Sequence, residues 1–323
     1  MTPVIILDTD MDTDCDDAGA LALAMHCHRQ GHIRLGAVIC DVLSPWPGAY
    51  TRAALNTYGL EDVPVGINCH CPNSAAYAAY IDQLRAKAFP FYNELIARQH
   101  GLTPGYIPGL SDAIALYRRV LAASEDHNVI VCAVGLLSLL PALLASAPCE
   151  YSPLPGRELV KRKVCELVTM ANAPFPEGAE VFNWRMDAAH AAAALADWPT
   201  PITVSWSGGD ILTSPPDQPP GNPIHDAYRI WHRGKQNRHR PSWDLVATLW
   251  AARQHPELFT RRAPAHLSLN PQNAHYQWAC SNANSAKDTH THGCLYPNTT
   301  NEAITAVIQN LLNEATTTAQ RRE

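Results

Sequence analysis

The residues best suited to chemistry lie in one short stretch near the start of the chain. Six carboxylates fall within residues 8–17, after an apolar run at residues 4–7 and before an Ala- and Leu-rich run at residues 18–24. They are Asp8, Asp10, Asp12, Asp14, Asp16 and Asp17. So many like charges repel one another unless a cation or helix amide groups hold them, and oxygen donors at this density suit a hard divalent ion, Ca²⁺ or Mg²⁺. Capping a helix near Asp16 needs only one acid, so capping alone does not explain the cluster.

The flanking runs predict the elements that position these acids. Residues 4–7 are typical of a buried strand and residues 17–29 of a helix, so the acids lie on the turn between them. Further apolar strands are predicted at residues 33–40, 63–67, 129–134, 164–170 and 201–205. Because helical segments separate these strands, we expect an α/β fold with a mostly parallel sheet covered by helices on both faces. Ligands of such sheets bind at the carboxyl ends of the strands, where the acid-rich turn lies.

The rest of the chain carries weaker signals. Ser111 is predicted to cap a helix that runs to about residue 123, and residues 136–147 and 301–315 predict two further helices. The polar segment from about 264 to 292, rich in Asn and His, is expected to be weakly structured. No internal repeat or domain boundary is evident, so we expect a single domain over residues 1–323.

Composition limits the classes of partner. The 323 residues are 46% apolar and carry a net charge of −6, so the chain can bury a substantial core but has no basic surplus to neutralise nucleic-acid phosphates. The short basic pieces 161–163 and 238–240 are expected to be solvated surface. No apolar run has the length of a membrane span and no signal peptide precedes the first strand, so a cytoplasmic protein without membrane partners is expected.

The ten cysteines are scattered, and in the cytoplasm they are expected to be thiols. Cys69-His70-Cys71 and His26-Cys27-His28 lack the spacing of a structural zinc site. An EF-hand loop starting at Asp8, Asp10 or Asp12 would lack both the glycine at its sixth position and the glutamate at its twelfth. These patterns therefore leave the acid-rich turn as the main candidate site.

The acid-rich turn, taken with the strand before it, resembles a known family. Residues 5–10 followed by Asp16-Asp17-Ala18 are similar to the amino-terminal signature of the inosine–uridine-preferring nucleoside hydrolases, in the subgroup whose loop is two residues longer. Later segments fit the same family in the same order; they are residues 54–59 with 63–66, 131–138, 180–188 and 242–244. The first motif is specific, and the others gain weight from their order along most of the chain.

The resemblance implies a nucleoside hydrolase-like fold with a Rossmann-like core and a Ca²⁺ cofactor. The implied reaction is hydrolysis of the N-glycosidic bond of a small-molecule ribonucleoside to ribose and free base, and the implied assembly is a homo-oligomer. The implied calcium ligands are the carboxylates of Asp10, Asp17 and Asp244 and the carbonyl of Val134. Asp10 is also the implied general base. Asp16, Glu180 and Asn183 are the residues implied to bind ribose hydroxyls.

The chain departs from the family pattern in places. Counting from the strand selects Asp10 as the first ligand, whereas counting back from Asp16-Asp17 at the short-loop spacing selects Asp12. The strand count is preferred because insertions fall in loops. Glu180 and Asn183 are one residue further apart than the family's pair. Ser44 stands where the family often has Asn.

The largest departure is Trp243. The family often has a His there, thought to protonate the leaving base, whereas an indole N–H does not titrate in the working range and can only stack on a base. His225, His232 and His239 are nearby in sequence and are expected at the surface. Trp184 and Trp206 are candidates for a base-stacking wall with Trp243, or for core packing.

Two other functions stay open at this stage. Loss of the acid at position 243 would suit a calcium-dependent nucleoside-binding protein that no longer turns over its ligand. A magnesium-dependent haloacid-dehalogenase-type phosphatase would use Asp8 as nucleophile and Asp10 as acid. That family usually has Thr or Val where Asp12 stands, and it leaves Asp16-Asp17-Ala18 unexplained.

Overall fold

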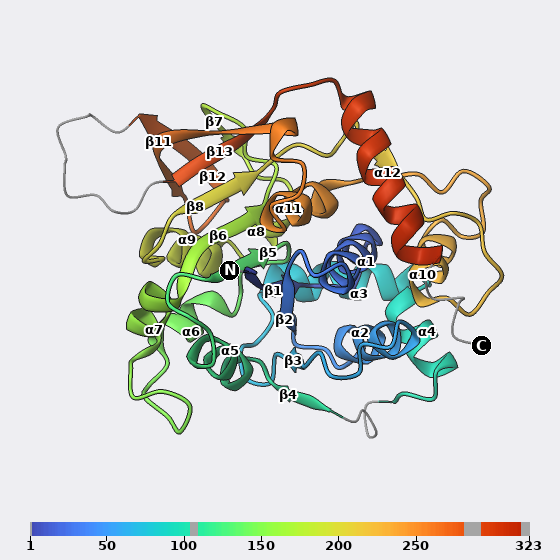
Figure 1. Ribbon diagram of the computed structural model, residues 1–323, viewed down its shortest axis with the longest axis horizontal. Helices are drawn as coiled ribbons and strands as arrows, with labels where there is room; N and C mark the ends of the chain where they lie inside the picture. Colours follow the sequence, from blue (N-terminus) through green and yellow to red (C-terminus); the bar gives the residue numbers. More distant parts are fainter. Residues whose placement is uncertain (1, 104–108, 281–291, 318–323) are drawn as a thin grey trace.

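A mixed sheet of eleven strands forms the centre of the protein (Figure 1). The computed structural model describes residues 2–103, 109–280 and 292–317, and all structural statements concern these residues. In order across the sheet the strands are β4 (Leu110–Asp112), β3 (Val65–Ile67), β2 (Arg34–Cys40), β1 (Val4–Thr9), β5 (Val129–Ala133), β6 (Val164–Met170), β8 (Ile202–Ser205), β13 (His292–Pro297), β11 (Phe259–Leu269), β12 (His275–Cys280) and β7 (Glu177–Ala179). Neighbours from β4 to β13 are parallel, and β13, β11, β12 and β7 are joined antiparallel.

Helices cover both faces of the sheet. One group is α1 (Asp16–Arg29), α2 (Trp46–Thr57), α4 (Tyr92–Gln99), α10 (Pro223–Trp231), α11 (Trp243–Ala251) and α12 (Asn301–Thr317), seen on the right in Figure 1. The other is α5 (Ala113–Ala122), α6 (Leu140–Ala145), α7 (Gly156–Lys163) and α9 (Ala188–Asp197), on the left. The remaining elements are α3 (Ala75–Ala86), α8 (Asn183–Met186), the 3₁₀ turn Pro256–Leu258 and the small ladder of β9 (Leu212–Thr213) with β10 (Arg240–Pro241). The predicted α/β fold, with a mostly parallel sheet covered on both faces, is confirmed.

Strand β1 shows why the sequence folds this way. All six of its residues are buried. Ile5 and Leu7 pack into the core under α1 and α11, and Val4 and Ile6 pack into the core on the opposite face. A strand buried on both faces needs continuous apolar residues, and each such side chain contributes roughly 1.5–3 kcal/mol on burial.

Several sequence-based expectations are corrected. The polar segment 264–292 was expected to be weakly structured, but its described residues form most of β11, β12 and the start of β13; residues 281–291 of it lie outside the described chain. Successive side chains of these antiparallel strands point to opposite faces of the sheet, so the strands lack the continuous apolar run by which the other strands were predicted. Helix α5 is capped by Asp112, whose carboxylate accepts a hydrogen bond from Ala115 N at 2.8 Å, and Ser111 lies in β4.

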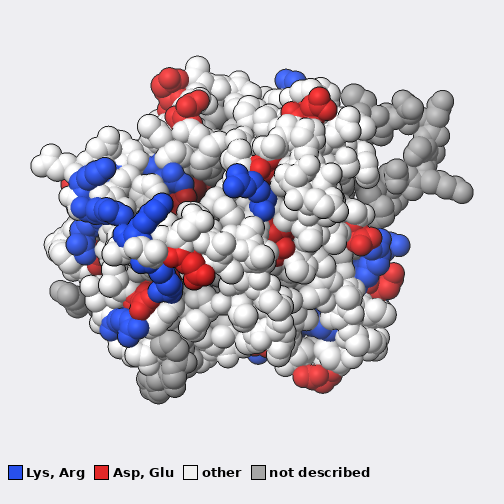
Figure 2. All heavy atoms as spheres, turned by 180° about the vertical axis from the view of Figure 1, so that it is seen from behind, with Lys and Arg blue, Asp and Glu red and all other residues white. Residues whose placement is uncertain are grey.

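Charged groups of both signs lie side by side on the face seen in Figure 2. Among the ion pairs of the described residues, Arg98 Nη2 and Glu94 Oε1, one turn apart on α4, lie 2.8 Å from each other. In the described part of the chain, no helix combines the length and the apolarity that crossing a bilayer would need.

Two local features place the acid-rich turn. Gly19 lets α1 pack tightly, because a Cβ at that position would lie 2.9 Å from the Leu245 Cδ1 of α11. Met11, in the turn, has a φ of 44°, which is uncommon for a residue with a side chain. The close approach of α1 and α11 brings the start of both helices to the carboxyl end of β1.

Candidate active site

A cavity of about 430 Å³ opens at the carboxyl ends of the central strands. Acidic, aromatic, amide and aliphatic residues, with Met170 and one arginine, line it. They belong to Asp10, Asp14, Asp16, Asp17, Tyr80, Val134, Met170, Asn172, Glu180, Val181, Phe182, Asn183, Trp231, Arg240, Trp243 and Asp244. The residues implied as ion ligands, general base or ribose contacts, together with Trp243, therefore all border this cavity, although they come from segments that are far apart in the sequence.

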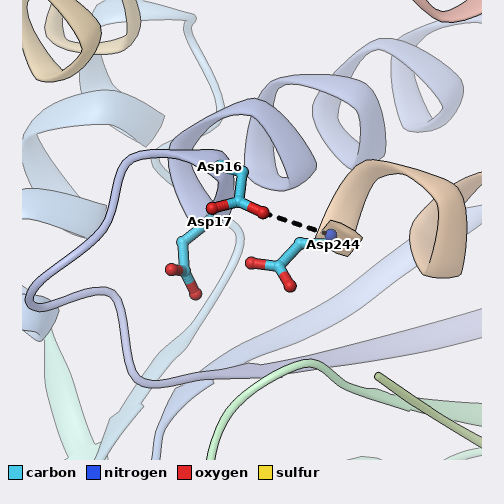
Figure 3. A group of neighbouring side chains, drawn as sticks. All are labelled: Asp16, Asp17 and Asp244. Atoms are coloured by element: carbon cyan, nitrogen blue, oxygen red, sulfur yellow. Dashed lines mark hydrogen bonds between the residues drawn. The ribbon is translucent and has the colours of Figure 1, made fainter. Parts of the chain in front are cut away.

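Three buried aspartates in this cavity form a group that could hold a metal ion. Asp16 and Asp17 come from the first turn of α1, and Asp244 comes from the first turn of α11. One oxygen from each lies within 4.8 Å of the others. Figure 3 shows the Asp17 and Asp244 carboxylates directed into a shared space, with Asp16 accepting a hydrogen bond from Asp244 N at 3.4 Å.

The donor set fits a hard divalent cation. Asp244 Oδ1 is buried and has no hydrogen-bond partner among the described residues. A cation bound between the three carboxylates would supply that partner. Burial, followed by repulsion between neighbouring carboxylates, raises the pKa of Asp16, Asp17 and Asp244 well above the usual range. Without a cation the group therefore holds protons to a higher pH than free aspartates do, and a divalent ion would displace them.

Asp10 and Asp12, the two alternatives for the first ligand, lie in different environments. Asp10 borders the cavity, and its carboxyl lies within hydrogen-bonding reach of Asp17. Asp12 is absent from the cavity lining: its carboxylate accepts hydrogen bonds at 2.8 Å from Tyr77 Oη on α3 and from Asn93 Nδ2 on α4. This geometry favours Asp10 over Asp12, as the strand count does. The three acids close enough together to hold an ion are Asp16, Asp17 and Asp244, so Asp10, an implied ligand, lies outside that group and Asp16, an implied ribose contact, lies within it.

Val134 and Asn183 are in direct contact. Asn183 Nδ2 donates a hydrogen bond of 2.6 Å to the carbonyl oxygen of Val134, the predicted neutral ligand. Asn183 is the first residue of α8, and Val134 follows β5. The two predicted functions, metal ligand and ribose contact, therefore meet at one hydrogen bond.

Glu180 is held by main-chain amides. Its carboxylate accepts hydrogen bonds from Asn172 N at 3.3 Å, Phe182 N at 2.9 Å and Arg185 N at 3.1 Å. Burial raises its pKa, and the amides partly offset that rise. These contacts fix the carboxylate at the cavity wall, within the loop that connects β7 to α8.

The aromatic wall differs from the one considered from the sequence. Trp243 lines the cavity and packs against Gly209, where a Cβ would lie 2.9 Å from the indole Cζ2. Trp184 is fully buried in the core, and Trp206 is absent from the lining and packs edge to face on Tyr296. The aromatic residues that join Trp243 are Tyr80, Phe182 and Trp231.

None of the three nearby histidines borders the described cavity. His225 is buried, contrary to the expectation of a surface position, and contacts Arg238 Nη1 at 2.8 Å. His232 is partly buried and packs edge to face on Trp231, while His239 is exposed. The described residues that line this cavity therefore include no imidazole that could take the place of the histidine often found at position 243 in the family that the turn resembles.

Asp14 and Arg240 also line the cavity, and the sequence assigned neither of them a role in the site. Residues 238–240 were expected to be solvated surface, but the Arg240 side chain is only 20% exposed and its guanidinium donates to both oxygens of Asp14. Burial pushes the pKa of Asp14 upward, yet the hydrogen bond with Asp16 and the charge of Arg240 outweigh it, so the pKa is lowered. The only signal in the sequence was the position of Arg240, four residues before Asp244.

Asp8 and Asp41 form a buried pair of carboxyl groups, and this pair makes the free energy of unfolding depend on pH. Tyr117 Oη donates to Asp8, Leu136 N donates to Asp41 at 2.6 Å, and the two carboxyl groups are within reach of each other. Burial raises the pKa of Asp8 to about 7, and burial together with the Asp8 charge raises that of Asp41. A pKa raised on folding stabilises the protein at low pH, and this contribution disappears as the pH rises through the folded value.

We therefore expect the free energy of unfolding at saturating calcium to fall as the pH rises through about 7. Asp8→Asn should remove most of this fall, because an amide has no proton to lose. Urea unfolding from about pH 6 to about pH 8 measures the effect, with the exposed Asp62→Asn as control. An unchanged pH profile in Asp8→Asn would contradict the assignment to this pair.

Comparison with known proteins yields matches in structure only. No protein-family model matches the chain, and no curated protein matches its sequence. A plant nucleoside hydrolase, the PpNRh1 enzyme, matches with a TM-score of 0.62 at 18% identity, over 97% of this chain and 99% of that one. An inosine–guanosine nucleoside hydrolase matches with a TM-score of 0.64 at 14% identity, over 96% and 98% of the two chains.

A third match is the type III effector protein XopQ, whose structure is a complex with adenosine diphosphate ribose. It has a TM-score of 0.65 at 15% identity, over 98% of this chain and 94% of that one. Likeness at such low identity bears on the fold alone. The protein described here therefore has the nucleoside hydrolase fold, with a buried group of aspartates at the carboxyl edge of its sheet.

Proposed function

We propose that this protein is a calcium-dependent N-ribohydrolase that cleaves a ribonucleoside to ribose and free base. The observation that carries the proposal is the convergence of Asp16, Asp17 and Asp244 in one cavity, with Asp244 Oδ1 left without a partner. The aromatic side chains above them suit a flat heterocyclic base. The resemblance of the acid-rich turn to nucleoside hydrolases and the shared fold support the same activity.

In this proposal Asp10, Asp17, Asp244 and the Val134 carbonyl hold the ion. Bound Ca²⁺ would lower the pKa of the attacking water and fix the ribose hydroxyls. Asp10 accepts the proton of that water. The water oxygen bonds to the anomeric carbon as the bond to the base nitrogen breaks; the electron pair of that bond leaves with the base, which takes up a proton from solvent.

The remaining residues position the substrate. Asp16 accepts a hydrogen bond from a ribose hydroxyl, and Glu180 and Asn183 contact the outer hydroxyls. Positive charge develops on the ribosyl group in the transition state, and the nearby carboxylates stabilise it. Trp243 stacks on the base, and its contact with Gly209 holds the indole in place.

The second candidate is a calcium-dependent binding protein without turnover. Two observations favour it: Trp243 stands where an acid is expected, and the described cavity lining contains no histidine. The XopQ structure shows the same fold in an effector with a bound ribose-containing nucleotide.

Ribose release with and without chelator tests the proposed function, alongside calorimetry of riboside binding. Calcium-dependent accumulation of free ribose supports the hydrolase. Riboside binding with no ribose release supports the second candidate. Phosphate release from phosphate esters, with no ribose from ribosides, would instead support a phosphatase. Resemblance also leads us to propose a homo-oligomer, which light scattering of the full chain measures.

The missing acid predicts a strong dependence on the leaving group. We expect kcat/KM for p-nitrophenyl riboside, whose leaving group departs as a stabilised anion, to exceed that for inosine by about 100-fold or more, because a general acid typically contributes 10²–10⁴-fold. Trp243→His should narrow the ratio by supplying an imidazole. Parallel steady-state assays of both substrates measure it, and similar kcat/KM values in the wild type would show that another group protonates the base.

A further inference from the structure

Arg240 is the one cationic side chain on the wall of the described cavity, among five aspartates and one glutamate. Its guanidinium forms a fork on Asp14, with Nε at 2.8 Å from Oδ1 and Nη2 donating to Oδ2. The same Nε lies 3.5 Å from Asp16 Oδ1. One cation therefore bridges two acids of the turn.

The position of Arg240 is built into the fold. Its backbone pairs with Thr213 in the β9–β10 ladder, and its guanidinium lies over the Trp231 ring at 4.7 Å from the centroid. Trp231 is in turn fixed to the acid-rich turn, because its Nε1 donates a hydrogen bond of 2.9 Å to Thr13 O. Stacking and pairing of this kind leave a guanidinium little freedom to leave its place.

Asp16 is held from both sides. Oδ1 faces Arg240, and Oδ2 accepts the hydrogen bond from Asp244 N. Without Arg240, Asp14 would be an unpaired carboxylate two residues from Asp16, beside the Asp16–Asp17–Asp244 group. Another unpaired carboxylate at such a site increases its attraction for a divalent cation.

We propose that Arg240 is a built-in counter-ion that keeps Asp14 out of the divalent-ion site and orients Asp16 toward the ribose. This positioning role rests on the proposed function for its substrate, but its effect on ion binding does not require turnover. The charge of Arg240 sets the affinity for the ion, and its Nε, 3.5 Å from Asp16 Oδ1, sets the direction of Asp16.

Ion affinity of the full chain provides the first test, by calorimetry with Ca²⁺ and by Tb³⁺ luminescence. We expect Arg240→Gln to bind Ca²⁺ about tenfold more tightly than the wild type, and Asp14→Asn about tenfold more weakly, because each leaves one charge uncompensated. The double variant Asp14→Asn/Arg240→Gln should return to the wild-type affinity. Arg238→Gln is the matched control, since Arg238 pairs with the exposed Asp217 outside this cavity.

Thermal stability gives a readout that needs no substrate. Without calcium, Arg240→Gln should melt at a lower temperature than Arg238→Gln, and calcium or the added Asp14→Asn change should remove the difference. A merely structural role for Arg240 would lower calcium affinity and would not be rescued by Asp14→Asn. Unchanged or weaker Ca²⁺ binding in Arg240→Gln would overturn the proposal.

Arg240→Lys separates charge from geometry. It retains the charge but not the fork, so we expect near-wild-type Ca²⁺ affinity with severalfold weaker riboside binding at saturating calcium; unchanged riboside binding would overturn the orienting role. If the wild type binds no divalent ion but Arg240→Gln does, the proposed function fails and the counter-ion role stands. If neither binds one, both fail.

Discussion

Asp17→Asn is expected to abolish ribose release, with a loss of at least about 1,000-fold in kcat/KM. Asp17 is buried at the start of α1, accepts a hydrogen bond from the Thr9 hydroxyl and lies within reach of Asp10. Asparagine keeps the size of the side chain and can still accept that hydrogen bond, but it removes one negative charge from the ion site. The ion should therefore bind more weakly, and the water and ribose should lose their common anchor.

Ribose assays and Ca²⁺ calorimetry on the same preparation measure both effects. Asp10→Asn should behave similarly for release, because it removes the proposed base as well as a ligand. Asp62→Asn is the control, since Asp62 is exposed and far in sequence from the turn. Wild-type release in Asp17→Asn would refute the site assignment, whatever its calcium affinity.

The second large effect concerns stability with and without calcium. Burial and mutual repulsion raise the pKa of Asp10, Asp16, Asp17 and Asp244, so the metal-free protein favours their protonated forms. Their contribution to stability is present at low pH and is lost as the pH rises through the folded pKa values. Calcium requires the deprotonated forms, so its stabilising effect should grow as the pH rises.

Melting temperatures with calcium and with chelator measure this difference. At about 100 times the dissociation constant a ligand stabilises by about 2.7 kcal/mol, which for a chain of this size corresponds to a rise of roughly 4 °C. We expect that rise near pH 8 and a much smaller one near pH 5. A calcium effect that is equal at both pH values would contradict the proposed ligand set.

The sequence predicted those parts of the fold that local pattern determines. Continuous apolar strands such as Val129–Ala133 were sufficient to predict a mostly parallel sheet. The abrupt change from apolar residues to acids to an Ala- and Leu-rich run was sufficient to predict β1 and α1. The antiparallel strands β11 and β12 were missed, because partly exposed strands carry polar residues at alternate positions. Cap position was also missed at α5, where Ser111 and Asp112 are both suitable residues.

The candidate site shows the same division. The resemblance to nucleoside hydrolases implied the roles of Asp10, Asp16 and Val134, and each of them follows or flanks an element that the sequence predicts. Arg240 and Trp231 could not be predicted, because their place in the cavity depends on how the β9–β10 ladder packs against the acid-rich turn. Asp14 could be identified as one of the acids of the turn, but its pairing with Arg240 could not be predicted.

The separation of the ion-binding groups along the chain has a consequence for synthesis. Asp16 and Asp244 are 228 positions apart, and β13, near the carboxyl end, completes the sheet beside β8. A ribosome therefore releases the acidic turn long before it releases α11, which supplies Asp244. A polypeptide that terminates before Asp244 lacks one of the three grouped acids and the strands that complete the sheet, so it cannot assemble the proposed ion site.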